Sequence, residues 1–178
     1  MKIYTKTGDA GETGLLGGHR ARKSAPRVAS YGEVDELNAT LGLAAAYVQN
    51  PDVRDVLVTI QSDLFAVGSL LADPDATFKS DKVTLDATAV ERLEKEIDRF
   101  ELTLPPLTRF ILPGGSDGGA LLHLTRAVAR RAERALVALD EKETLPKTLV
   151  PYMNRLSDLL FVLARAENRF RGAEEKPW

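Results

Sequence analysis

A stretch rich in glycine and threonine near the amino terminus has the composition of a phosphate-binding segment. Residues 5–14 read Thr-Lys-Thr-Gly-Asp-Ala-Gly-Glu-Thr-Gly, and Arg20, Arg22 and Lys23 follow. The glycines let backbone amides turn toward a ligand, and the hydroxyl and ammonium groups supply further donors, as a polyphosphate requires. The Gly-Lys-Ser/Thr ending of a Walker A loop is missing. The segment predicts either an arm that binds phosphates or a flexible, soluble tail.

A second group of charges lies on one predicted helix, between residues 123 and 134. At ~100° per residue, Arg126, Arg130, Glu133 and Arg134 share one face of that helix. Arg131 points away from them, so the geometry favours a structural role for it. Three arginines on one face repel one another unless an anion lies against them. A triphosphate would meet that need, but a solvated face or a salt-bridge network between subunits would also explain the pattern.

Polar residues flank the apolar stripes of two other predicted helices. Asp35 and Asn38 share one face of the first helix, and Asn154 and Asp158 share one face of the last. Such residues either cap neighbouring groups or face a site, and periodicity does not decide between the two roles.

Helical periodicity dominates the chain and predicts the elements that would position these groups. Apolar residues recur at three- and four-residue steps over residues 34–48, 53–71 and 90–97. Two further helices are predicted, one from the glycine-rich loop 114–119 to about residue 139 and one from about residue 151 to 170. Asp86 is the predicted cap of the third helix, and a polar loop is predicted over residues 73–82. Convincing strand alternation is missing throughout.

The predicted fold is therefore all-α, an antiparallel five-helix bundle preceded by an irregular phosphate-binding arm. A single domain is expected over residues 1–178, with the arm at 1–25, the helical bundle at 26–170 and a C-terminal tail at 171–178.

Composition narrows the possible functions. The net charge of −2 disfavours nucleic acid as a partner, and the absence of cysteine excludes a disulfide framework, a thiolate metal site and a cysteine nucleophile. No apolar run approaches the ~20 residues of a membrane span, so we expect a cytoplasmic protein without a membrane partner. His123 is expected to be a packed or surface imidazole, because no second histidine lies at metal-binding spacing.

Five motifs, in order along the chain, resemble the signatures of PduO-type ATP:cob(I)alamin adenosyltransferases. They are residues 2–9 (Lys-Ile-Tyr-Thr-Lys-Thr-Gly-Asp), 31–38 (Tyr-Gly-Glu-Val-Asp-Glu-Leu-Asn), 110–115 (Phe-Ile-Leu-Pro-Gly-Gly), 130–134 (Arg-Arg-Ala-Glu-Arg) and 154–158 (Asn-Arg-Leu-Ser-Asp). The resemblance implies transfer of the 5′-deoxyadenosyl group of ATP to the cobalt of cob(I)alamin, giving adenosylcobalamin and triphosphate. It also implies a homotrimer with active sites between subunits.

Carried over by position, the resemblance implies two sets of site residues. ATP would be bound by Thr5, Lys6, Thr7, Gly8, Thr13, Gly14, Lys23, Arg130, Arg131, Glu133, Arg134 and Asn154. The corrinoid would be bound by Asp35, Phe110 and Arg126, and catalysis would depend on these three and Arg130. Arg126 would pair with Asp35 of a neighbouring subunit, and Phe110 would press on the lower face of the corrinoid and displace its axial ligand. Gly14 stands where some relatives have a hydroxyl residue, so it would offer only its backbone amide.

The resemblance implies no metal site built by the protein, because Mg²⁺ would ride on the triphosphate. It implies a reductase and a B12-dependent acceptor enzyme as partners. On the residues alone, three other functions stay open: a non-catalytic ATP and corrinoid chaperone or sensor, a structural helical oligomer, and an ATP-using transferase with a different acceptor. The first would bind ATP without releasing triphosphate, and the second would have no use for a phosphate-binding arm.

Overall fold

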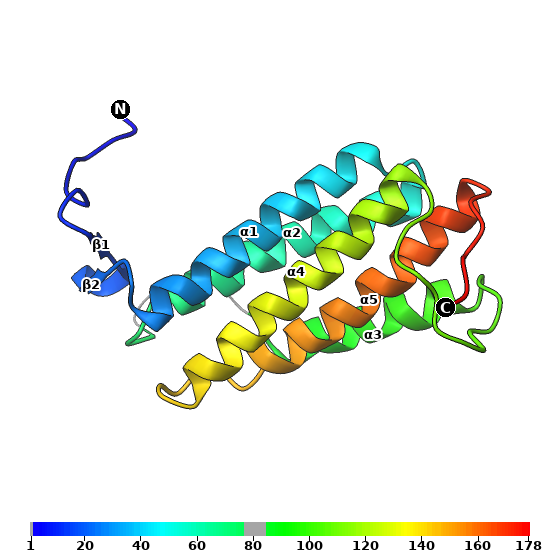
Figure 1. Ribbon diagram of the computed structural model, residues 1–178. Coiled ribbons are helices and arrows are strands. Elements are labelled where there is room, and N and C mark those ends of the chain that lie inside the picture. The colour runs from blue at the N-terminus through cyan, green and yellow to red at the C-terminus, as the bar shows by residue number, and fades with distance from the viewer. Residues whose placement is uncertain (1, 77–84) are drawn as a thin grey trace.

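Five helices form an elongated bundle in the computed structural model, which describes residues 2–76 and 85–178. They are α1 (Pro26–Tyr47), α2 (Pro51–Leu71), α3 (Ala87–Glu101), α4 (Asp117–Asp140) and α5 (Leu149–Phe170). Helix α1 packs against α2 and α4, and α5 packs against α4 and α3, so α1, α4 and α5 lie in the middle of the bundle (Figure 1). The predicted all-α five-helix bundle is confirmed.

Local signals explain where most helices begin. Pro51 opens α2 behind Asn50, whose side chain accepts a hydrogen bond of 3.1 Å from the Asp52 amide. Asp86 accepts a hydrogen bond from the Thr88 amide at the start of α3, as predicted. These side chains satisfy amides that have no partner within the helix.

Helix α1 begins at Pro26, earlier than the apolar periodicity predicted. The missed turns contain two polar residues that are buried, Arg27 and Ser30. Arg27 donates a hydrogen bond to the Leu71 carbonyl and forms an ion pair of 2.6 Å with Glu143. Because Arg27 and Ser30 take buried positions here, the spacing of apolar residues did not predict this part of the helix.

The arm, which was predicted to be irregular, contains a small hairpin. Strands β1 (Glu12–Gly14) and β2 (Arg20–Arg22) pair in antiparallel register, with Thr13 opposite Ala21, around a short 3-10 turn at Leu16–Gly18. Strands of three residues are too short to show an alternating pattern.

The bundle core consists of aliphatic side chains contributed by all five helices. Those with no more than 2% exposure include Leu37, Leu41, Leu57, Leu64, Leu93, Leu122, Leu136, Leu156 and Leu160. No helix in the described part of the chain is long and apolar enough to cross a bilayer.

The arm and the loop that carries Phe110 lie at opposite ends of the bundle. In Figure 1 the hairpin extends from the beginning of α1, whereas the loop between α3 and α4 lies beside the C-terminus at the far end. Helix α4, with 24 residues, spans about 36 Å between these ends. Residues 77–82 of the predicted polar loop lie outside the described residues.

Candidate active site

The first part of the candidate site is the turn at residues 5–7 of the arm. The hydroxyl oxygens of Thr5 and Thr7 lie 2.9 Å apart, and Arg20 donates a hydrogen bond of 2.7 Å to the Thr7 carbonyl. Between the two threonines, Lys6 has a φ of 60°, which is uncommon for a residue other than glycine. Such backbone conformations concentrate at ligand-binding sites. The turn thus presents two hydroxyls and an exposed ammonium group together.

Gly8 brings a second lysine to this turn. An added Cβ at Gly8 would lie 3.1 Å from the Glu12 carbonyl and 3.3 Å from Nζ of Lys23, so a larger residue would disturb the contact. The amide of Lys23 donates a hydrogen bond of 2.9 Å to the carbonyl of Gly11, whose φ of 84° favours glycine. The hairpin therefore returns the chain so that the Lys23 ammonium lies beside residue 8.

Thr13 and Gly14 occupy β1, further along the same hairpin. Thr13 is half-buried, and the space beside Gly14 is open, with no atom within 4 Å of a Cβ built there. A side chain would therefore fit at position 14, and glycine is not required by packing.

The second part of the candidate site is the arginine face of α4, formed by Arg126, Arg130 and Arg134. No carboxylate in residues 2–76 and 85–178 forms an ion pair with any of the three. Burial, and then the charge of Arg130, lowers the pKa of Arg126 from its ordinary value. The Nε atom of Arg126 is buried and has no hydrogen-bond partner among the described residues. The face is therefore a row of cations without an ion-pair partner in the described part of the chain.

A shallow hollow of about 270 Å³ lies along this face. Arg130, Glu133, Arg134 and Glu141 line it, together with Val137 and Ala138. Arg130 and Arg134 are exposed, and the Arg134 guanidinium donates a hydrogen bond of 3.0 Å to the Arg130 carbonyl. An anion could therefore reach both guanidinium groups from solvent.

Arg131 lies away from the arginine face and has two carboxylate partners on α1. Its Nε pairs with Glu33 at 2.6 Å, and a terminal nitrogen pairs with Glu36. These hydrogen bonds raise the pKa of Arg131 above its ordinary value. The structure thus gives Arg131 a role in joining α1 to α4, while its assignment to ATP stays a prediction.

Asn154 connects the arginine face to α5. Its amide donates a hydrogen bond of 2.9 Å to Glu133, and its oxygen accepts one of 2.9 Å from Arg155. Arg155 is in turn paired with Glu94 of α3 at 2.8 Å. Glu133 is thereby held by Asn154 and does not neutralise Arg130.

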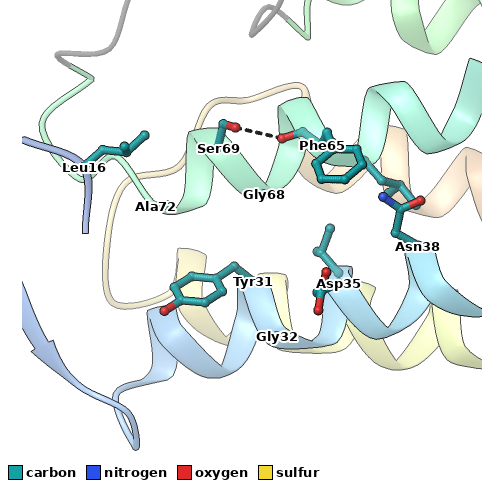
Figure 2. Close-up of a pocket in the computed structure, with 11 residues that line it drawn as sticks. Leu16, Tyr31, Gly32, Asp35, Asn38, Phe65, Gly68, Ser69 and Ala72 are labelled. Atoms are coloured by element: carbon teal, nitrogen blue, oxygen red, sulfur yellow. Dashed lines mark hydrogen bonds between the residues drawn. The ribbon is translucent and has the colours of Figure 1, made fainter. Parts of the chain in front are cut away.

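Asp35 faces a cavity of about 420 Å³ between α1 and α2 (Figure 2). Tyr31 and Asp35 lie on one wall, Phe65 and Ser69 lie on the other, and Leu16 of the arm borders one end. Sequence reasoning missed Leu16, Phe65 and Ser69 as lining residues. Phe65 is 71% exposed and lies off the apolar stripe of α2. A phenylalanine outside that stripe was the feature of the sequence that could have indicated a lining residue.

Phe110 projects from the loop between α3 and α4 and is 79% exposed. A large aromatic ring left in solvent at a loop suggests a surface that receives a ligand or partner. Within one chain the loop between α3 and α4, which carries Phe110, is remote from the arm (Figure 1). The single chain therefore assembles the arm residues with one another and the arginine face with Asn154, and no hydrogen bond or ion pair among the described residues joins these groups to each other.

His123 is packed inside the bundle beside Arg126. It is 4% exposed, and its ring meets that of Phe161 edge-on, with centroids 5.9 Å apart. Burial, and then the charge of Arg126, lowers the pKa of His123 to about 4, against an opposing effect of Glu175. Its ring is therefore neutral at neutral pH. The described residues contain no group of three or more histidine or acidic side chains that could hold a metal ion.

The chain is similar to known proteins over nearly its whole length. The family model for cobalamin adenosyltransferase matches residues 3–167. The cobalamin adenosyltransferase of Cupriavidus metallidurans is 47% identical, with 99% of this chain and 94% of the relative covered. The corrinoid adenosyltransferase of Bacillus subtilis is also 47% identical, with 97% and 89% covered.

Among solved structures, the chain is similar to a variant of the PduO-type ATP:corrinoid adenosyltransferase from Lactobacillus reuteri in which a phenylalanine is replaced by alanine. That protein was solved in complex with cobalamin and ATP, and the match has a TM-score of 0.93 at 35% identity, covering 99% of both chains. From the motif order, the five-helix bundle and these matches, it follows that the chain belongs to the cobalamin adenosyltransferase family.

Proposed function

We propose that this protein transfers the 5′-deoxyadenosyl group of ATP to the cobalt of cob(I)alamin, with release of triphosphate. The observation that carries the proposal is the arginine face of α4, three cations that the described residues leave without an ion-pair partner. Like charges on one helix face destabilise the helix unless an anion lies against them. A triphosphate supplies that anion, and membership of the family supplies the identity of the acceptor.

In this proposal two groups of residues hold the nucleotide. The arm contributes Thr5, Lys6, Thr7, Gly8, Thr13, Gly14 and Lys23, and the helices contribute Arg130, Arg131, Glu133, Arg134 and Asn154. Hydroxyl groups and backbone amides donate to phosphate oxygens, while arginine and lysine add charge-assisted hydrogen bonds. Mg²⁺ rides on the triphosphate and keeps much of its water shell. Glu133, held by Asn154, sets the edge of the site.

The active site is assembled between subunits of a homotrimer. The support is geometric, because the arm and the Phe110 loop of one chain lie at opposite ends of a bundle about 36 Å long. Large apolar side chains are also exposed along the helices, at Leu43, Tyr47, Val58, Phe65, Leu124 and Val137. Burial of such residues against a second copy is the usual way in which exposed apolar surface is removed from water.

The reaction needs no nucleophile from the protein. The electron pair of Co(I) attacks the 5′ carbon of ATP, the cobalt–carbon bond forms, and the C5′–O bond breaks as triphosphate leaves with its electron pair. The role of the protein is to position ATP and to stabilise the negative charge that grows on the leaving group. Arg130 and the arm lysines serve this purpose, and loss of one such donor typically costs ~10²-fold or more in rate.

The corrinoid edge of the site involves Asp35, Phe110 and Arg126. Phe110 lies against the lower face of the corrinoid and excludes the axial ligand, so that a four-coordinate cobalt is easier to reduce. Arg126 pairs with Asp35 of the partner subunit. The carboxylate of Asp35 is exposed, and Nε of Arg126 has no hydrogen-bond partner in residues 2–76 and 85–178, which supports this pairing. In the cytoplasm, a reductase would supply the reduced cobalt and a B12-dependent enzyme would accept the product.

The test is anaerobic incubation of the protein with ATP, Mg²⁺ and chemically reduced cobalamin. We expect the absorption spectrum of adenosylcobalamin to appear together with free triphosphate, in equal amounts. A chaperone or sensor on the same fold would bind ATP and cobalamin without forming either product. Release of phosphate or diphosphate in place of triphosphate would also contradict the proposed chemistry.

A further inference from the structure

The loop that carries Phe110 has no regular secondary structure between the end of α3 and the start of α4. Its own side chains face solvent at Leu107 and Phe110, which are 47% and 79% exposed. An aromatic ring that must stay over one face of a flat ligand needs a fixed backbone beneath it. The contacts that fix this loop come from α5 and from the residues that follow it.

Arg165 holds the first part of the loop. This α5 residue is 3% exposed, and its guanidinium donates a hydrogen bond of 2.9 Å to the Pro105 carbonyl. The same group forms an ion pair of 2.6 Å with Glu175. A buried guanidinium thus connects the loop before Phe110 to the tail that follows α5.

The tail in turn pairs with the loop at Phe110 itself. The Trp178 amide donates a hydrogen bond of 2.9 Å to the Phe110 carbonyl, and the Leu112 amide donates one of 2.8 Å to the Lys176 carbonyl. Ile111 lies opposite Pro177 in this short antiparallel ladder. Because Glu175 directly precedes the ladder, the ion pair with Arg165 sets where the ladder lies.

A second α5 residue, Asn168, holds the loop beyond Phe110. Its amide donates a hydrogen bond of 2.8 Å to the Gly114 carbonyl, and its oxygen accepts one of 2.9 Å from the Ser116 amide. Asn168 is 2% exposed and lies one helical turn after Arg165. The backbone on both sides of Phe110 is therefore fixed to the same face of α5.

We propose that Arg165 and Glu175 are positioning residues for Phe110, acting through the tail ladder and the Pro105 carbonyl. This inference rests on the proposed function, in which Phe110 displaces the axial ligand of the corrinoid. A buried ion pair contributes little net stability compared with an apolar replacement of the same volume. We expect this ion pair to matter because it fixes the position of the Phe110 loop relative to α5.

The chain offers a matched control for this pair. At the other end of the bundle, Arg27 is also buried, donates to a backbone carbonyl at 2.8 Å and pairs with Glu143 at 2.6 Å. Glu175→Ala and Glu143→Ala therefore remove the same kind of interaction and leave the same kind of buried arginine. A double variant, Arg165→Met with Glu175→Leu, removes the Arg165 pair without leaving a buried charge unpaired.

The experiment measures turnover from cob(II)alamin with a supplied reductant, the KM for ATP, and the fraction of bound cob(II)alamin without an axial base, from its absorption spectrum. We expect both Glu175→Ala and the double variant to lose about 10- to 100-fold in turnover and to retain the axial base, with the KM for ATP unchanged. Glu143→Ala should lower the melting temperature without these changes.

Wild-type turnover and wild-type spectrum in the double variant would overturn the inference. So would a loss of the same size in Glu143→Ala, because the effect would then reflect general stability. A wild-type protein that forms no adenosylcobalamin would instead refute the proposed function, so the two failures are distinguishable.

Discussion

The proposed nucleotide site depends on the arginines of α4, which have no ion pair among the described residues. Arg131, their neighbour in sequence, has two carboxylate partners, whereas Arg130 is exposed and has no ion pair among the described residues. Arg131 therefore joins two helices, whereas the proposed role of Arg130 is to bind a ligand. Helical geometry alone could predict that the two arginines lie on different faces of α4, because each residue advances by ~100° around the helix.

Replacing Arg130 by alanine should weaken ATP binding and turnover together. We expect kcat/KM for ATP to fall by ~10²-fold, because a charge-assisted contact to the leaving triphosphate is lost. The melting temperature should change little, since the side chain is exposed. Steady-state kinetics and thermal denaturation check this, with Arg99→Ala as a control at an exposed arginine of α3. Unchanged kinetics would remove Arg130 from the site.

Phe110→Ala should lower turnover with the corrinoid without changing the affinity for ATP. Turnover from cob(II)alamin is expected to fall by about 10²-fold or more, because the axial ligand is no longer excluded and the cobalt is harder to reduce. ATP affinity should be retained, since the proposed role of Phe110 is to contact the corrinoid and not the nucleotide. Leu102→Ala, at another exposed apolar residue after α3, is the control. A comparable loss of ATP binding would contradict the role assigned to Phe110.

His123 predicts a pH dependence of stability. Its pKa is about 4 in the folded chain against 6.5 unperturbed, so the unfolded state binds more protons between these values. Stability is therefore present above pH 6.5 and is lost as the pH falls toward 4. The loss attributable to this residue is on the order of 3 kcal/mol. Urea unfolding of wild type and His123→Leu across this range checks it, and identical pH slopes would contradict it.

At the scale of elements, the predictable parts were those with strong local signals. Helices α2 and α3 have an apolar stripe and a side-chain cap, and both were predicted close to their observed limits. The first turns of α1 were missed because Arg27 and Ser30 occupy buried positions. The hairpin of the arm was missed because its strands are held by backbone pairing over three residues each.

Some residues of the candidate site could likewise be predicted from the sequence, and others could not. Motif residues such as Lys6 and Asn154 could be named from the sequence, because their types and order resemble a known family. Phe65 and Leu16 could not, because a cavity wall depends on how α1, α2 and the arm meet in three dimensions. The ion pair between Arg165 and Glu175 could not be predicted from the sequence either, because no local pattern indicates which carboxylate a buried arginine will pair with.

Deleting residues 2–9 should weaken ATP binding with little effect on the bundle. The described contacts from the arm to the bundle include one backbone hydrogen bond, from Leu16 to Ala72, and the pair of His19 with Asp75, and both lie outside the deleted segment. We expect the KM for ATP to rise by about tenfold or more, a loss of ~1.4 kcal/mol or more in binding. Circular dichroism melting should stay near the wild-type value. A large drop in melting temperature would instead make the segment a structural element.

At the scale of the whole molecule, the separation of the arm from the Phe110 loop is the basis for proposing a site shared between copies of the chain. Each bundle presents the arm at one end, the arginine face along α4 and the aromatic loop at the other end (Figure 1). A ring of three copies would let the arm of one protomer close over the arginine face of the next. Sequence physics could not reveal this, because exposed apolar residues identify a surface and not its partner.

Mixed oligomers test the account most directly. One preparation carries Lys6→Ala with Lys23→Ala in the arm, the other carries Arg130→Ala on α4, and the two are unfolded together and refolded in equal amounts. If arm and arginine face meet across a protomer boundary, about one quarter of the sites in random trimers are intact, and adenosylcobalamin formation returns to about that fraction of wild type. If the mixture is no more active than the two variants refolded separately, the shared site is contradicted.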